Sequence, residues 1–311
     1  MKVGIFNNDY SRQILTDLDD SQSYQWLINI GKTDHRYSVY CGSRSPLEQL
    51  FVAARLLKDI RSSQISEVIL PNSHCIITGV LLGGLRGEVR FSQVAEGTLN
   101  YHKRSVGPKE LVRFILKRVI CAVSLLKFKP NCSDPINLKE NGDYKIYCRM
   151  KEGLVTNAKS RHVVKYRKPY VVTPNSNAVV IAGQHISDSV CDKYLKEMLP
   201  SELRDYLRGK KIYYQPHPRS ADYGAREIEM VYEGLDLELL SSGYSSLEEA
   251  VCGIGASDVV TVGGTSAYLD FVGRGLSLKM HAFGFSLLVL SGFSQYKDLR
   301  GLHENLGVKI Y

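Results

Sequence analysis

The sequence predicts an α/β protein made of two doubly wound, Rossmann-like halves. Short β-branched and apolar runs alternate with helix-length segments, which is the pattern of βαβ units and a parallel sheet. The alternation starts twice, first at the N-terminus and again near Tyr170. With 311 residues and 44 % apolar composition, the chain is long enough for two domains that each have a core.

Residues 1–102 form the first predicted half. The strands are short runs rich in valine, isoleucine and aromatic residues, and the helix carries leucines at helical spacing. The sequence predicts strands at 2–6, 36–41, 66–71 and 87–94, and a helix over 47–60. Residues 170–311 form the second half by the same criteria. Its predicted strands are 170–174, 177–183, 211–216, 237–241 and 258–264, and its helices cover 189–208 and start again at Ser246.

Residues 103–169 separate the halves and form a basic, helical linker region. Within it, Lys109, Arg113 and Lys117 repeat every four residues among large apolar side chains, after Pro108 at a plausible helix start. This pattern is typical of a helix that lies on an anionic membrane surface. The alternative is an amphipathic helix packed on its own domain with a solvated cationic stripe. Nucleic acid is not expected as a partner, because the cations are not interleaved with aromatic residues over a broad face.

Composition restricts the compartment and the kind of partner. The seven cysteines are scattered, without a C-x-x-C pair, which argues against a disulfide framework or a zinc site and favours a reducing cytoplasm. The first residues read as a strand rather than a signal peptide, and no apolar run is long enough to cross a membrane. The net charge of +8 favours an anionic partner.

Two motifs offer acid–base groups at predicted strand ends. Glu96 follows the strand 87–94 and precedes a glycine, so it is a candidate general base; an exposed turn glutamate is the alternative. His217 lies between Pro216 and Pro218 after the strand 211–216. The two prolines make a stiff seat, which suits a proton donor, whereas a rigid loop with a solvated histidine is the alternative.

Two further motifs offer nucleotide contacts at predicted helix starts. Gly264, Thr265 and Ser266 follow a strand and open a helix, where backbone N–H groups and hydroxyls can bind a phosphate; a simple helix cap is the alternative. Ser245 with Glu248, or Ser246 with Glu249, has capping-box spacing. One of these carboxylates could instead hold a ribose hydroxyl.

The ordered set Glu96-Gly97, His217-Pro218 and Thr265-Ser266 resembles the bacterial GT-B sialyltransferases of the lipooligosaccharide and capsule type, over nearly the whole chain. The resemblance implies a GT-B fold in which the two halves face each other across a central cleft. It implies that Glu96 is the base for the acceptor hydroxyl and that His217 assists departure of the CMP phosphate. Thr265 and Ser266 would bind that phosphate, and Gly183 and Gln184 would lie near the nucleotide. The chain departs from the pattern at Ala95, where the family has a second acidic residue.

The expected activity is thus inverting transfer of sialic acid from CMP-sialic acid to a terminal hydroxyl of a surface glycan, lipid-linked or free, at the inner face of the membrane. No metal or other cofactor is expected, because a monophosphate leaving group needs only a helix dipole, hydroxyls and His217. The acidic run at 17–20 is interpreted as a solvated helix face. Two alternatives stay open: a GT-B transferase with another nucleotide sugar, and a nucleotide- or glycan-binding protein without turnover.

Overall fold

The computed structural model describes thirteen stretches of the chain and three single residues. They are 1–18, 24–30, 45–71, 75–95, 108–129, 145–151, 154, 158, 160–166, 175–184, 195–217, 227–240, 244, 246–265, 267–291 and 295–311. All structural statements below concern these residues. None of the helices among them is both long and apolar enough to cross a bilayer.

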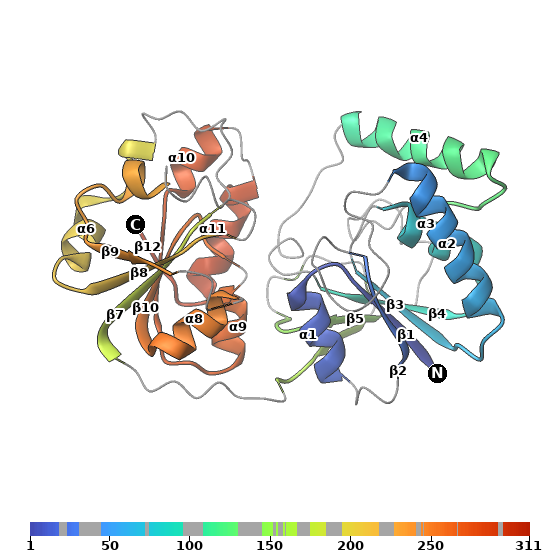
Figure 1. Ribbon diagram of the computed structural model, residues 1–311, viewed down its shortest axis with the longest axis horizontal. Coiled ribbons are helices and arrows are strands. Elements are labelled where there is room, and N and C mark those ends of the chain that lie inside the picture. The colour runs from blue at the N-terminus through green and yellow to red at the C-terminus, as the bar shows by residue number, and fades with distance from the viewer. Residues whose placement is uncertain are drawn as a thin grey trace. The chain divides into compact units, whose positions relative to one another are not determined.

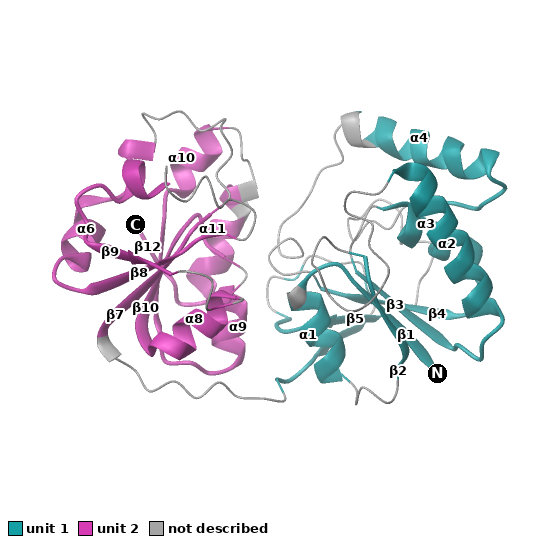
Figure 2. Cartoon of the chain, in the orientation of Figure 1, with its two compact units in different colours: residues 1–167 teal, residues 168–311 magenta. Residues whose placement is uncertain are grey.

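The chain divides into two compact units, Met1–Arg167 and Lys168–Tyr311 (Figure 2). Each unit contains a six-stranded sheet whose neighbouring strands all pair in parallel. Such sheets need crossover connections, and helices supply them in both units (Figure 1). The predicted pair of Rossmann-like units is therefore confirmed.

The sheet of the first unit has the order β2-β1-β3-β4-β5-β6. Its strands are β1 Lys2–Phe6, β2 Tyr24–Asn29, β3 Glu67–Pro71, β4 Arg90–Val94, β5 Lys145–Cys148 and β6 Ser160–Val163. Its helices are α1 Asp9–Leu18, α2 Pro46–Arg61, α3 Ile76–Gly84 and α4 Pro108–Val123.

The sheet of the second unit has the order β12-β11-β10-β7-β8-β9. Its strands are β7 Asn175–Ala182, β8 Lys211–Gln215, β9 Leu237–Leu239, β10 Ala256–Val262, β11 Lys279–Phe283 and β12 Lys309–Ile310. Its helices are α6 Ser201–Leu207, α8 Leu247–Ile254, α9 Ala267–Gly273, α10 Phe285–Leu290 and α11 Gln295–Asn305.

Alternation along β1 shows how the first core forms. Val3 and Ile5 are buried against α2 and α3, whereas a side chain at Gly4 would collide with Leu27 and would lie tightly against Leu15 of α1. Successive residues of a strand point to opposite faces, so helices pack on both sides of the sheet. Helix α2 begins where the sequence places its cap: Ser45 accepts from the backbone N–H of Glu48, and the Glu48 carboxylate accepts from the N–H of Ser45.

Two predicted boundaries differ from the structure. The described part of 103–169 belongs to the first unit, where α4, β5 and β6 extend the fold and the sheet, so the third region is not a separate body. In the predicted helix 189–208, the helical residues 195–196 are separated from α6 by Pro200, which is the N-cap of α6, because proline has no N–H and terminates a preceding helix. The predicted strands 36–41 and 170–174 lie outside the described residues.

Candidate functional site at the carboxyl edge of the second sheet

The strand order of the second unit locates its candidate site. In order of appearance, its strands lie 3-2-1-4-5-6, with β7 first and β10 fourth. The direction of the connections reverses between β7 and β10, and ligands of open α/β sheets bind at such a point, outside the carboxyl ends of the strands. Gly183 and Gln184 follow β7, and Gly263, Gly264 and Thr265 follow β10. The structure thus brings two of the predicted nucleotide-binding segments to one place.

Packing by itself requires glycine at positions 183 and 264. A side chain at Gly183 would collide with the Tyr214 hydroxyl, and one at Gly264 would collide with the ring of His303. Gly264 also has a φ of 83°, which non-glycine residues rarely adopt. Because packing alone explains both residues, these glycines are not by themselves evidence for a phosphate.

The backbone after β10 offers a more direct indication of an anion site. The N–H of Gly263 is used, donating 2.7 Å to the carbonyl oxygen of Phe283. Among the described residues, the next two N–H groups, those of Gly264 and Thr265, make no hydrogen bond, and both residues are partly exposed. Successive unpaired N–H groups beside left-handed backbone form concave sites that bind anions.

Thr265 acts as a cap in this structure. Its hydroxyl oxygen accepts from the N–H of Ala267 at 3.3 Å, which agrees with the capping alternative and leaves its own O–H free to donate. The helix that follows, α9, is short. Ser266, its predicted partner in phosphate binding, lies outside the described residues.

Gln184 ties β7 to both neighbouring segments. Its side-chain amide donates 3.2 Å to the carbonyl oxygen of Gly264, and its backbone N–H donates 3.0 Å to the Oε2 of Glu227. The sequence places Gln184 near a nucleotide without indicating either bond. In the structure its described contacts position the loop after β10.

Glu227 is a buried carboxylate that the sequence does not reveal. Its Oε2 also accepts from the Tyr214 hydroxyl at 2.9 Å, and its Oε1 is buried without a hydrogen-bond partner. Burial raises the pKa of Glu227 to about 7, although the two donors oppose the rise. The sequence around Glu227 gives no sign that this side chain is buried, because the groups that bind it, Gln184 and Tyr214, belong to distant segments of the chain.

A second acidic group lies at the starts of α8 and α9. Ser246 is the N-cap of α8 and accepts from the N–H of Glu249 at 3.2 Å, so of the two predicted spacings the structure shows the second. Glu248 is half-buried in the same turn. Burial and then the negative charge of Asp270 on α9 raise the pKa of Glu248 to about 7, while Arg274 opposes the rise. Asp270 was not predicted, although an acid inside Y-L-D-F-V is a recognisable anomaly.

Of the remaining predicted site residues, the structure describes one and leaves three outside the described residues. His217 follows Pro216 after β8, the strand next to β7, and is partly exposed. Glu96, Pro218 and Ser245 lie outside the described residues. The residue before Glu96 is described: Ala95 is fully buried and donates from its N–H to Tyr147, which continues the sheet pairing.

Metal-ligating side chains do not cluster in the part of the chain that the structure describes, where no group of three or more could hold an ion. The run at 17–20 was expected to be solvated, and this is wrong for Asp17. Its Oδ2 lies 2.5 Å from the Nη2 of Arg149, whose side chain is almost fully buried. The ion pair joins the end of α1 to the segment after β5.

Comparisons with known proteins identify the fold. No protein-family model matches the sequence, and no curated protein sequence is significantly similar to it. MnaA of S. aureus, solved with UDP, is 11 % identical with a TM-score of 0.53; the match covers 98 % of this chain and 87 % of that one. The UDP-GlcNAc 2-epimerase of Methanocaldococcus jannaschii is 12 % identical with a TM-score of 0.50, over 98 % and 92 % of the two chains. At such identities the likeness concerns the fold, and the chain has an α/β fold of the GT-B type, built of two Rossmann-like units.

Proposed function

We propose that the protein is a glycosyltransferase that binds a nucleotide-activated sugar at the carboxyl edge of its second sheet. A UDP-sugar is the favoured donor. The observation that carries the proposal is the pair of unpaired N–H groups at Gly264 and Thr265, located where the strand order reverses. The UDP bound to MnaA, a protein of similar fold, is the reason to prefer UDP over CMP.

The charges around this edge suit a nucleoside diphosphate. The two N–H groups and the Thr265 hydroxyl can donate to phosphate oxygens, and His217 can donate to the second phosphate of the leaving group. Glu248, which is half-buried at the start of α8, provides an acidic acceptor for a ribose hydroxyl, as carboxylates do in other nucleotide-binding folds. Glu96 keeps its proposed role as the base that deprotonates the acceptor hydroxyl.

Two other reactions are compatible with the same edge. CMP-sialic acid would need one anion site rather than two, and the motifs at His217 and Thr265 remain the argument for it. Epimerisation of a UDP-sugar is suggested by the fold of the M. jannaschii enzyme. Besides these two reactions, the protein could bind a nucleotide at this edge without turnover.

A ligand panel separates these proposals. UDP should raise the melting temperature more than CMP, UMP, GDP or ADP at equal concentration, because a ligand at a hundredfold excess over Kd stabilises the native state by about 2.7 kcal/mol. Thr265→Val should reduce the UDP shift and Thr265→Ser should preserve it, because serine keeps the hydroxyl. A larger shift with CMP would return CMP-sialic acid to first place. No shift with any nucleotide would refute the site.

Product analysis then distinguishes the reactions. NMR of a UDP-GlcNAc incubation would show a new C2 epimer for an epimerase, and free UDP for a transferase that hydrolyses its donor slowly without acceptor. Release of UDP without epimer is the expected result. An epimer would replace the transferase proposal while leaving the nucleotide site intact.

A further inference from the structure

Helix α4 has an exposed apolar face that none of the described residues of the first unit covers. Its six large apolar side chains outside the packed face are between 53 % and 82 % exposed, and Leu125, just beyond the helix, is 94 % exposed. Together they define the exposed face, which consists of Leu111, Val112, Ile115, Leu116, Val119, Val123 and Leu125. Exposed apolar residues scattered singly are normal, but a contiguous set marks an interaction surface.

The helical geometry places this face away from the protein. At about 100° per residue, the six helical members span a sector of about 140°. Cys121, which is fully buried, lies about 150° from the centre of that sector. Figure 1 shows α4 on the outer side of α3. The alternative from the sequence, an amphipathic helix packed on its own domain with a solvated cationic stripe, holds for the side that carries Cys121, but it does not account for the exposed apolar sector.

The end of α4 is firmly anchored, so its exposed face is not a frayed segment. Gly79 and Gly83 of α3 allow the chain after α4 to approach closely, because side chains there would collide with Phe128 and with the backbone of Lys127. The N–H of Lys129 also donates 2.9 Å to the carbonyl oxygen of Gly79. The surface is held by backbone contacts on the buried side.

Leu125 is unfavourable at its position for two separate reasons, which are backbone strain and exposure of its side chain to water. The N–H of Leu126 donates to the carbonyl oxygen of Cys121, and the N–H of Leu125 to that of Ala122, which is the Schellman arrangement at a helix end. Leu125 therefore occupies the left-handed position, with a φ of 57°, where glycine is preferred. A leucine that is strained and also almost fully exposed contributes nothing to the isolated fold that glycine would not.

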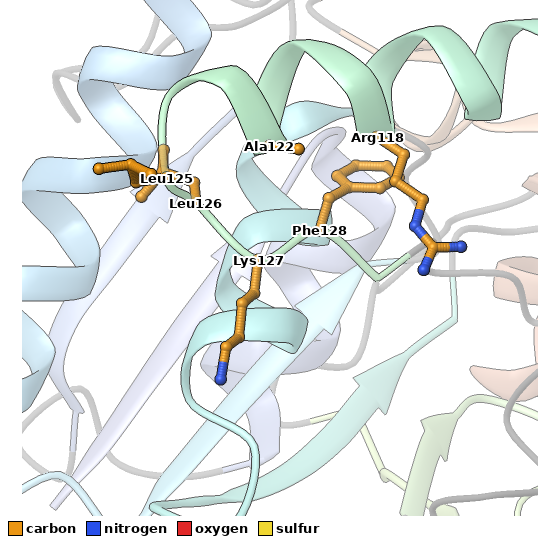
Figure 3. A pocket seen from close by; sticks show the side chains of 6 residues that line it. All are labelled: Arg118, Ala122, Leu125, Leu126, Lys127 and Phe128. Carbon is orange, nitrogen blue, oxygen red and sulfur yellow. The ribbon is translucent and has the colours of Figure 1, made fainter.

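The cations are arranged around the exposed face. Arg113 and Arg118 lie at its two borders, and within the described residues neither makes an ion pair. Residues 108–129 carry six lysines and arginines against one glutamate. Near the helix end, Arg118 and Lys127 line a pocket of about 360 Å³ (Figure 3). The other residues that line it are apolar: Ala122, Leu125, Leu126 and Phe128.

We propose that the exposed face docks on an anionic lipid bilayer, with its apolar side chains at the headgroup–acyl boundary and its cations against lipid phosphates. An apolar sector bordered by arginines is the signature of an interfacial helix. A second copy of the chain is disfavoured as the occupant, because it would bring the same cations face to face. Docking does not depend on the nucleotide site, since every residue involved belongs to the first unit.

Vesicle sedimentation of the full chain tests the proposal. The protein should sediment with phosphatidylcholine vesicles that contain phosphatidylglycerol, much less with pure phosphatidylcholine, and less at high salt, because salt screens the attraction between the cations and an anionic surface. Arg113→Glu with Arg118→Glu should weaken binding at least about tenfold, because it removes two of these cations. Ile115→Ser with Val119→Ser should weaken it by at least about tenfold through lost apolar burial.

Leu125→Gly is the sharpest variant because fold and docking should respond in opposite directions. Its melting temperature should be unchanged or higher, since the strain at φ 57° is relieved, while binding to vesicles should fall about tenfold. The matched control is Leu290→Ser, which removes an exposed leucine of α10 in the other unit and should bind as the wild type does.

The proposal is overturned if the wild type does not sediment with anionic vesicles, or if Leu125→Gly and Ile115→Ser/Val119→Ser bind as tightly as it does. It is also overturned if size-exclusion chromatography shows a wild-type dimer that these variants dissociate, since the face would then be an interface between copies.

Discussion

The side-chain amide of Gln184 donates a hydrogen bond of 3.2 Å to the carbonyl oxygen of Gly264, which connects the ends of β7 and β10 where the strand order reverses. The bond orients the peptide that carries the N–H of Thr265, one of the two proposed phosphate donors. Gln184 is therefore expected to act on nucleotide affinity through the position of this loop.

Replacing Gln184 with methionine keeps its length and removes the bond. We expect UDP to bind about tenfold more weakly, with a loss of stability of about 1 kcal/mol, the usual contribution of one hydrogen bond. Isothermal titration and thermal melts measure the two effects. Unchanged UDP affinity in a folded Gln184→Met protein would show that the loop is held by other contacts.

Glu248 and Glu249 form a matched pair in the first turn of α8. At pH 8, above the pKa of about 7 that burial gives Glu248, Glu248→Gln should weaken UDP binding about tenfold, because a charged acceptor for a ribose hydroxyl is replaced by a neutral one. Glu249→Gln, in the more exposed neighbour, should leave binding unchanged. The proposed ribose contact is wrong if the two variants bind UDP equally well.

His217→Ala should lower kcat by about 10²–10⁴ while the Kd for UDP changes little, because proton donation to a leaving phosphate matters most in the transition state. The control is His162→Ala, which removes an exposed histidine from β6 in the other unit. Steady-state rates and nucleotide titrations separate the two parameters. Equal loss of kcat in both variants, or none in either, would contradict a leaving-group role.

Stability should depend on pH through Glu227. Its pKa is raised from an ordinary value near 4.5 to about 7, so the folded state holds a proton that the unfolded chain releases between these values. The contribution is fully present below about pH 4.5 and is lost as pH rises through 7; it amounts to roughly 3 kcal/mol.

Melting temperatures at pH 5 and pH 8 test this dependence. The wild type should be less stable at pH 8, and Glu227→Gln, which has no proton to lose, should show a smaller difference between the two values. The same pH difference in wild type and variant would mean that Glu227 is not protonated in the folded protein.

The sequence by itself determined the fold class and most of the strands that carry the site. Alternating apolar runs predicted β1, β3, β4, β7, β8, β9 and β10, and the glycines after β7 and β10 marked where two of those strands end. This works because hydrophobic periodicity and turn residues are local properties of the chain. Five strands, β2, β5, β6, β11 and β12, were not predicted, because their runs are short and partly polar.

Only the tertiary structure decided which groups meet. Burial raises the pKa of Glu227 although Tyr214 and Gln184 donate to its carboxylate from two strands, and burial together with Asp270 from another helix raises the pKa of Glu248. The same holds for α4: cations that repeat every four residues among large apolar side chains indicated an amphipathic helix, but not which apolar side chains face water. Burial and hydrogen bonding depend on residues distant in sequence, and a pattern within one segment contains no information about its neighbours in space.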